Sequence, residues 1–304
     1  MNNNIRAIDL FAGCGGMTAG FKNVGFDIVA AFENWEPAIK CYSKNFTHRI
    51  FSLDLSDLDT AIAVIKEINH EIIIGGPPCQ DFSHAGKRLE GKRANLTIVF
   101  ADIVSHIKPK WFVMENVDRI QTSYSYKIAK EMLKEENYGL TEIVLDASHC
   151  GVPQKRKRFF CIGMIDGSDD FLKDELISRQ TKKQMTMRDY FGSSLGLDYY
   201  YRHPRNYNRR AIFSLDETSP TIRGVNRPVP IGYPGHQNDP IPLNSDIRPL
   251  TTLERARVQT FPESYIWEGT KTDLEQMIGN AVPVKLAEFV ASILYDFIEG
   301  DNHG

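Results

Sequence analysis

A single cysteine, Cys79, stands in a segment whose composition suits the presentation of a nucleophile. Residues 75–83 are Gly-Gly-Pro-Pro-Cys-Gln-Asp-Phe-Ser, and the apolar run from Glu71 to Ile74 before them predicts a buried strand. Two prolines restrict the backbone before the thiol, and two glycines permit close approach of a ligand or another strand. The pattern predicts that the sulfur lies in the crevice above a sheet, where a thiolate could attack an electrophile. The alternative is that Cys79 is a small apolar core residue, as most unpaired cysteines are.

An acidic residue and two arginines form a second set of groups suited to catalysis. Glu115 ends an apolar run that begins at Trp111 and predicts another strand. A carboxyl group there can share or donate a proton, although it could instead cap the following turn. Arg156 and Arg158 lead into a further predicted strand, where side chains two residues apart share a face. We therefore expect both to point the same way; the alternative is a solvated run of charges.

The N-terminal segment contains a glycine-rich turn of the kind that binds nucleotides. Residues 9–16, Asp-Leu-Phe-Ala-Gly-Cys-Gly-Gly, join a predicted strand to a predicted helix, Met17–Asn23, at the carboxyl edge of a sheet. The full Gly-x-Gly-x-x-Gly pattern of dinucleotide enzymes is missing, so a purely structural turn is the alternative. Glu33, after the second strand, could hold a ribose, and Asp54, after the third, could accept a hydrogen bond from an adenine amino group. Together these features indicate S-adenosylmethionine binding.

These groups need a sheet that brings them to one edge. The first half of the chain alternates short β-branched runs with amphipathic segments, which is typical of a parallel sheet flanked by helices. Strands are predicted at Arg6–Leu10, Ile28–Phe32, Glu71–Ile74, Trp111–Glu115, Thr141–Asp146 and Arg158–Met164. Helices are predicted at Ala38–Asn45, Thr60–Asn69, Leu96–Ile107, Tyr126–Glu136, Leu250–Val258 and Pro283–Ile298.

The alternation stops after Asp166, where glycine, proline, arginine and tyrosine become frequent. We predict a catalytic and cofactor-binding domain of residues 1–165 and 250–304, and a small irregular lobe at 166–249. Although the chain has a net charge of −3, residues 179–227 carry ten lysines and arginines against four acidic residues, together with several tyrosines. Such a surface suits contacts with phosphates and bases. A solvated basic face without a partner is the alternative.

The composition excludes several classes of protein. With 42% hydrophobic and 25% charged residues, a chain of 304 residues can form one large core and a smaller lobe. No apolar run approaches the roughly 18 residues of a membrane span, and the N-terminus does not resemble a signal peptide, so a cytoplasmic location is expected. Five cysteines without Cys-x-x-Cys spacing argue against a disulfide framework and a structural zinc site, and no metal is expected.

Five segments resemble, in their order and separation, the cytosine-5 DNA methyltransferases. They are residues 9–16 and 75–83, Met-Glu-Asn-Val at 114–117, Gly-Val-Pro-Gln-Lys-Arg-Lys-Arg at 151–158 and Ile-Gly-Asn-Ala-Val-Pro at 278–283. The resemblance covers nearly the whole chain except roughly 166–215. It implies an α/β fold, a Rossmann-like S-adenosylmethionine-dependent methyltransferase sheet flanked by helices, with 166–249 as the target-recognition lobe. The implied reaction is methyl transfer from S-adenosylmethionine to carbon 5 of a cytosine in a short double-stranded DNA sequence, by base flipping and a covalent cysteine adduct.

The resemblance also implies roles for individual residues. Cys79 would be the nucleophile, Glu115 would act at ring nitrogen 3, Arg158 would contact the cytosine carbonyl oxygen, and Arg156 would brace Glu115. The cofactor contacts would be Phe11, Gly13, Gly15, Glu33, Asp54, Leu55, Pro77, Leu96, Asn280 and Val282. The DNA contacts would be Gln80, Ser83, Lys87, Arg88 and Arg93 from a loop that closes over DNA, and Arg209, Arg210, Arg223 and Arg227 from the lobe.

The resemblance is to the bacterial, restriction–modification type of enzyme. It implies a monomer that acts beside a cognate restriction endonuclease without forming a stable complex with it. Two alternatives remain open at the level of sequence: a tRNA cytosine-5 methyltransferase on the same core, and a non-catalytic nucleic-acid-binding module.

Overall fold

The computed structural model describes residues 5–78, 95–204, 206, 208–244 and 246–301. Its centre is a seven-stranded sheet with the order β3-β2-β1-β4-β5-β8-β6. Neighbouring strands from β3 to β5 are parallel, and β8 is antiparallel to both of its neighbours. The predicted α/β class is confirmed. The strands are β1 (Arg6–Leu10), β2 (Asp27–Glu33), β3 (Arg49–Ser52), β4 (Ile72–Gly75), β5 (Trp111–Val117), β6 (Tyr138–Asp146) and β8 (Lys157–Ile165).

All six predicted strands are present, within a few residues of their predicted bounds. The edge strand β3 has no fully buried residue, so it lacks the apolar run that identified the others. The antiparallel direction of β8 was not predicted. Only residues 147–156 separate β6 from β8, and this connection is too short for the crossover that a parallel pair requires.

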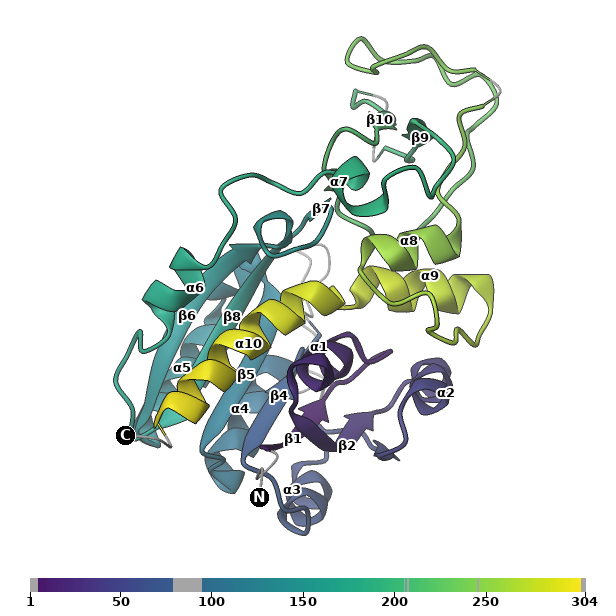
Figure 1. Ribbon diagram of the computed structural model, residues 1–304. Helices are drawn as coiled ribbons and strands as arrows, with labels where there is room; N and C mark the ends of the chain where they lie inside the picture. Colours follow the sequence, from purple (N-terminus) through teal and green to yellow (C-terminus); the bar gives the residue numbers. More distant parts are fainter. Residues whose placement is uncertain (1–4, 79–94, 205, 207, 245, 302–304) are drawn as a thin grey trace.

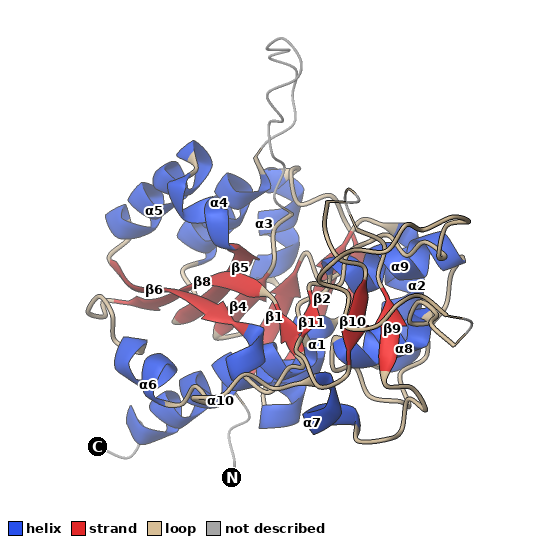
Figure 2. Cartoon of the chain, turned by 90° about the horizontal axis from the view of Figure 1, so that it is seen from above, coloured by secondary structure: helices blue, strands red, loops and turns tan. Residues whose placement is uncertain are grey.

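Helices cover both faces of the sheet (Figure 1, Figure 2). α3, α4 and α5 contribute to the apolar core on one face, and α1, α6 and α10 to the core on the other. The helices are α1 (Gly16–Val24), α2 (Glu36–Asn45), α3 (Leu58–Lys66), α4 (Leu96–Ile107), α5 (Tyr124–Glu135), α6 (Lys173–Ser178), α7 (Met187–Phe191), α8 (Thr252–Val258), α9 (Lys271–Asn280) and α10 (Val284–Asp301), with 3-10 turns η1 (Asp118–Thr122) and η2 (Ala147–His149).

The last helix returns to the first part of the chain. α10 packs along α1, and the approach is close enough that a Cβ atom at Gly20 would lie 2.5 Å from that of Ala287. A Cβ atom at Gly16 would similarly lie 2.2 Å from the carbonyl oxygen of Val282. The segment before α10 therefore lies against the turn after β1. Among the described residues, Lys271–Gly300 is long and apolar enough to cross a membrane by length and composition, but most of it is buried within the fold.

The lobe lies above the carboxyl end of the sheet in Figure 1 and contains little regular structure. β9 (Tyr199–Tyr201) and β10 (Ile212–Ser214) form an antiparallel pair, and β11 (Ser219–Pro220) pairs in parallel with β7 (Gln154–Lys155). The apolar core of the lobe includes residues of α7 and α8 and Ile278 of α9. β7, α8 and α9 therefore connect the lobe to the sheet. The division at residues 166 and 249 stays a prediction.

Candidate active site

A cavity of about 580 Å³ lies at the carboxyl edge of the parallel strands. β1 pairs with β2 on one side and β4 on the other, which is the topological switch point where α/β sheets bind ligands. The volume is in the range of small-molecule and cofactor sites. The predicted residues that line it are Phe11, Gly13, Glu33, Asp54, Leu55, Pro77, Leu96, Glu115, Arg158, Asn280 and Val282. Nine of the ten predicted cofactor contacts thus meet in one cavity with two of the predicted catalytic residues.

The glycine-rich turn and Glu33 hold each other in place. The amide of Gly13 donates to Glu33 Oε2 at 2.8 Å, and Glu33 Oε1 accepts from the amides of Asn34 and Trp35. Gly13 has a φ of 55°, and a Cβ atom there would meet no protein atom within 4 Å, so the backbone faces open space. Oε2 accepts only the bond from Gly13 among the described residues, so it retains a lone pair for a ribose hydroxyl. This arrangement fits the sugar of S-adenosylmethionine.

Of two further predicted cofactor contacts, Asp54 lines the cavity and Gly15 does not. Asp54 is held through Oδ1, which accepts from the amide and hydroxyl of Ser56, and no bond to Oδ2 is found within the described part of the chain. Oδ2 can therefore accept from an adenine amino group. Gly15 is absent from the lining: it precedes α1 with a φ of 84°, and a Cβ atom there would lie 2.4 Å from the ring of Phe46. Its requirement for glycine comes from packing.

Sequence reasoning missed Asp9, a carboxylate that lines the same cavity. Its side chain is 1% exposed; Oδ2 accepts from the hydroxyl of Thr18 at 2.6 Å, and Oδ1 has no partner within the described residues. Thr18 also contacts the hydroxyl of Tyr42, which bonds His48. Burial raises the pKa of Asp9 to about 7, against the opposing hydrogen bond from Thr18. The unpartnered oxygen suits a cationic ligand group, which is a further point of fit to S-adenosylmethionine.

Replacing Asp9 with asparagine is expected to change how the stability of the cofactor-free protein depends on pH. As pH rises, the free energy of unfolding of Asp9→Asn should increase relative to that of wild type. Because the folded pKa is raised, the stabilising contribution of the protonated form is complete below the unfolded value near 4 and is lost as pH passes about 7. One pKa unit corresponds to about 1.4 kcal/mol. By pH 9 the free energy of unfolding of Asp9→Asn should therefore have gained a few kcal/mol on that of wild type. Thermal unfolding of both proteins between pH 5 and 9 measures it. Asp54→Asn, in the same cavity but exposed, is the control, and parallel curves for wild type and Asp9→Asn would contradict the expectation.

Glu115 lines the cavity and forms an ion pair. Its side chain is 10% exposed, and Oε1 lies 2.8 Å from Nε of Arg158, while Arg158 Nη1 donates to the carbonyl oxygen of Lys157. Burial raises the pKa of Glu115, and the positive charges of Arg158 and then Arg156 oppose this. A Cβ atom at Gly76 would lie 3.0 Å from Oε2, so the glycine allows the turn after β4 to approach the carboxyl group. The carboxyl group is positioned for proton exchange with a ligand in this cleft.

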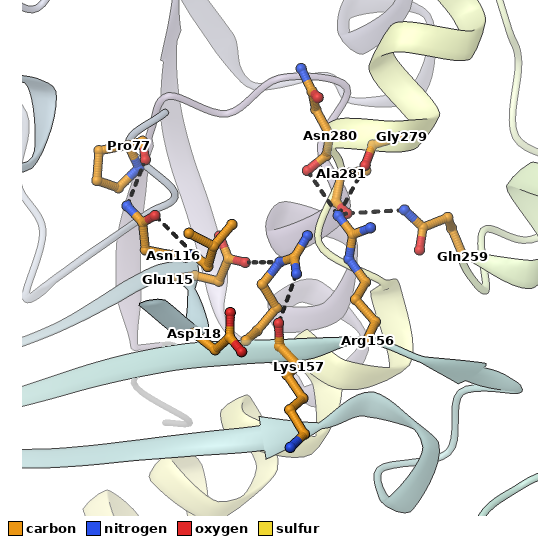
Figure 3. A network of polar contacts seen from close by, with 12 residues as sticks. Pro77, Glu115, Asn116, Asp118, Arg156, Lys157, Gln259, Gly279, Asn280 and Ala281 are labelled. Carbon is orange, nitrogen blue, oxygen red and sulfur yellow. Dashed lines mark hydrogen bonds and ion pairs between the residues drawn. The ribbon is translucent and has the colours of Figure 1, made fainter. Parts of the chain in front are cut away.

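Arg156 does not make the expected contact with Glu115. It lies between β7 and β8, is 1% exposed, and donates to the carbonyl oxygen of Ile222 at 3.0 Å. Figure 3 shows that it also donates to the carbonyl oxygens of Gly279 and Ala281, again at 3.0 Å. The ion pair of Glu115 is with Arg158 instead. Because the strand is interrupted at Arg156, the alternation of side chains that we used to relate the two arginines does not extend across this position. Arg156 holds together the lobe, the end of α9 and the strand that carries Arg158.

The turn that leads to the cysteine is held by β5. Asn116 Nδ2 donates to the carbonyl oxygen of Pro77 at 2.9 Å, and Asn116 Oδ1 accepts from the amide of Val117 (Figure 3). Pro77 and Pro78 both line the cavity beside Glu115. Cys79 follows Pro78 in the chain but lies outside the described residues, as do the predicted DNA contacts Gln80, Ser83, Lys87, Arg88 and Arg93.

A basic groove of about 960 Å³ lies between the lobe and β7. Arg209, Arg210 and Arg223 line it, whereas Arg227 lies at a separate, small cavity with His203. Three further basic residues line the groove, Lys155, Lys183 and Arg202, which the sequence did not single out as individual DNA contacts. Lys183 and Arg202 belong to the basic segment already identified, and Lys155 lies within the predicted arginine motif.

The comparisons with known proteins agree with this geometry. The family model for C-5 cytosine-specific DNA methylases matches residues 5–295. The chain is 55% identical to the Type II methyltransferase M.HindV of Haemophilus influenzae, over 96% of this chain and 97% of the relative. It is 57% identical to the Type II methyltransferase M.HgiDI of Herpetosiphon aurantiacus, over 97% of this chain and 95% of the relative.

Solved structures support the fold. The crystal structure of the S. pombe Dnmt2 methyltransferase matches with a TM-score of 0.73 at 19% identity, covering 97% of this chain and 99% of that one. The Entamoeba histolytica methyltransferase EhMeth matches with a TM-score of 0.65 at 16% identity, covering 98% and 99%. With the family match over nearly the whole chain, this protein belongs to the C-5 cytosine-specific DNA methylase family.

Proposed function

We propose that this protein is the modification methyltransferase of a Type II restriction–modification system. It transfers a methyl group from S-adenosylmethionine to carbon 5 of a cytosine in a short double-stranded DNA sequence. The observation that carries the proposal is the convergence of the nucleotide-binding turn, the Glu115–Arg158 pair and the Pro77–Pro78 turn before Cys79 in one cavity. Family membership and the Type II relatives agree with it.

Cys79 is the nucleophile in this proposal. Carbon 5 of cytosine is a weak nucleophile within the aromatic ring and becomes enamine-like only after a nucleophile adds to carbon 6. The thiolate forms the S–C6 bond and carbon 5 takes the methyl group. Water in the site then accepts the carbon 5 proton, and the S–C6 bond breaks to restore the thiolate. S-adenosylmethionine, when bound, supplies an activated methyl group on a sulfonium and leaves as S-adenosylhomocysteine. No metal takes part in the proposed reaction.

Glu115 and Arg158 stabilise the charge that forms on the cytosine. Addition of the thiolate places negative charge on ring nitrogen 3, where the carboxyl group of Glu115 donates a proton, and the carboxylate takes this proton back when the S–C6 bond breaks. Arg158 is fixed through Nε on Glu115 and through Nη1 on the Lys157 carbonyl. No other partner is found for it within the described residues, so its remaining N–H groups can donate to the cytosine carbonyl oxygen. Arg156, buried beneath them, is a positioning residue in this scheme.

The reacting carbon is stacked inside a duplex, so the target cytosine must rotate out of the helix to enter this cavity. The DNA contacts of the proposal come from residues 80–95, from the groove arginines Arg209, Arg210 and Arg223, and from Arg227. The protein acts as a monomer in the cytoplasm, with a cognate endonuclease that recognises the same sequence without a stable complex.

The test is tritiated methyl transfer from S-adenosylmethionine to unmethylated plasmid DNA and, separately, to tRNA, with bisulfite sequencing of the DNA. Methylation of one short DNA motif is expected. Incorporation into tRNA alone would instead establish a tRNA cytosine-5 methyltransferase. Absence of transfer to either substrate, with S-adenosylhomocysteine bound normally, would leave a nucleic-acid-binding module.

A further inference from the structure

Arg210 has an unusually fixed environment in the basic groove. Its Nη1 donates to Glu217 Oε1 at 3.1 Å, and its Nη2 forms an ion pair with Glu217 Oε2. The guanidinium carbon also lies 4.4 Å from the ring centroid of Phe213. The side chains of Arg210 and Glu217 are 30% and 35% exposed. Glu217 therefore holds the guanidinium in its own plane, and the ring of Phe213 lies against one face of that plane, before any ligand binds.

The contact with Glu217 leaves part of Arg210 available. A guanidinium has five N–H donors in a rigid plane, and Glu217 accepts from two nitrogens at the end of the fork. No partner of Nε is found within the described part of the chain. The edge formed by Nε and the adjacent Nη therefore keeps two parallel donors. Because Arg210 lines the groove, a ligand in the groove can reach this edge.

The other arginines of the groove have different partners from Arg210. Arg202 donates to the carbonyl oxygen of Thr221 at 2.8 Å, and Arg223 donates to that of His203 at 2.7 Å. Arg209 is exposed, and within the described residues no acidic partner or aromatic ring of the kind that orients Arg210 is found for it. A flexible charge of this kind suits a phosphate, whereas discrimination between bases requires fixed donors.

The groove adjoins the proposed cytosine site. Thr221 donates through its hydroxyl to the carbonyl oxygen of Lys155 at 2.6 Å, and both residues line the groove. Lys155 precedes Arg156, and Arg158 of the same segment holds Glu115. A duplex whose cytosine enters the cavity would therefore place neighbouring base pairs along this groove.

We propose that Arg210, oriented by Glu217 and Phe213, recognises a guanine of the target sequence by donating two hydrogen bonds to its O6 and N7 atoms in the major groove. The proposal rests on the proposed DNA methyltransferase function. Guanine presents two acceptors at this edge, and a bidentate arginine is the commonest specific contact to it. Glu217 is a positioning residue: it fixes the plane of the donors and touches no base.

The test compares Arg210→Lys and Glu217→Gln with wild type on oligonucleotides that carry every single-base change in the motif found by bisulfite sequencing. Lysine keeps the charge but loses the planar pair of donors. We expect kcat/KM discrimination at one G·C pair to fall by roughly 5- to 150-fold in Arg210→Lys, the range for a lost bidentate contact. Glu217→Gln should reduce discrimination at the same pair by a smaller factor. Discrimination at other positions should stay as in wild type.

Arg248→Lys is the matched control, because Arg248 makes a two-bond pair with Glu254 at 2.7 Å in the same part of the chain but outside the groove. It should retain full discrimination. Binding of S-adenosylhomocysteine checks the folding of each variant, and if Arg210→Lys does not fold, Glu217→Gln carries the test.

Two results would overturn the proposal. Unchanged discrimination at every position would mean that the Arg210–Glu217 pair only stabilises the turn after β10. An equal loss on all sequences with a weaker salt dependence would mean a phosphate contact. If wild type methylates no DNA motif at all, the proposed function fails, and this inference with it; selective wild-type methylation with an unaffected variant overturns the inference alone.

Discussion

Replacing Cys79 with alanine is expected to reduce methyl transfer by at least about 10⁴-fold. Without addition to carbon 6, carbon 5 of cytosine has no enamine character with which to attack a methyl group, and loss of a covalent nucleophile has effects of this size or larger. Tritium transfer to plasmid DNA under single-turnover conditions measures the loss. Affinity for S-adenosylhomocysteine should change little, because nine of the ten predicted cofactor contacts line the cavity and Cys79 is not one of the predicted contacts.

A second readout follows from the same chemistry. If the carbon 5 hydrogen of the target cytosine is replaced by fluorine, no proton can leave after methyl transfer, and the S–C6 bond should persist. Wild type should form a complex with such DNA that survives denaturant, and Cys79→Ala should form none. Cys150→Ala is the matched control, since burial raises the pKa of that thiol to about 12 and keeps it protonated. Residual transfer by Cys79→Ala near the wild-type rate would exclude the covalent route.

Local patterns were sufficient to predict the parts of the site that follow single strands. The turn after β1, Glu33 after β2 and Glu115 in β5 each lie at the end of an apolar run, and parallel strands bring their carboxyl ends to one edge. The helix predicted at Leu96–Ile107 has the bounds that the structure shows, and the structure adds that Asn95 caps it directly before the apolar run. In these cases the residues that determine the geometry are neighbours in sequence.

Contacts between distant segments could not be predicted in this way. Arg156 donates to a carbonyl oxygen 123 residues further along the chain, and the partner is a backbone atom that carries no signal of residue type. α9 was missed because it begins with polar residues, and its glutamate at 275 is buried through an ion pair with Arg255. Asp9 was overlooked because its role depends on an oxygen left without a partner after Thr18 has bonded the other. Each of these features is set by tertiary packing.

Replacing Glu115 with glutamine is expected to slow the chemical step by about 10²- to 10⁴-fold, the usual range for loss of a general acid. Glutamine has a similar shape and can still bond the cytosine and Arg158, but it has no proton to give to ring nitrogen 3. Single-turnover methyl transfer isolates this step from product release. Asp118→Asn changes a nearby exposed carboxylate in η1 and should leave the rate unchanged, which makes it the matched control.

The pH dependence distinguishes a proton donor from a group that only orients Arg158. The carboxyl group donates only when protonated, so its contribution is complete below its pKa and is lost as pH rises through it. Because burial raises that pKa, the protonated fraction persists to higher pH than for an exposed glutamate, while the thiolate of Cys79 becomes more abundant as pH rises. Wild type should therefore show a bell-shaped single-turnover profile, and Glu115→Gln should retain the rising limb of the thiol and lose the falling limb. If the rate of Glu115→Gln still falls at the same pH as that of wild type, the ionisation that causes the fall belongs to another group. If the single-turnover rate of Glu115→Gln equals that of wild type, Glu115 takes no part in the proton transfer.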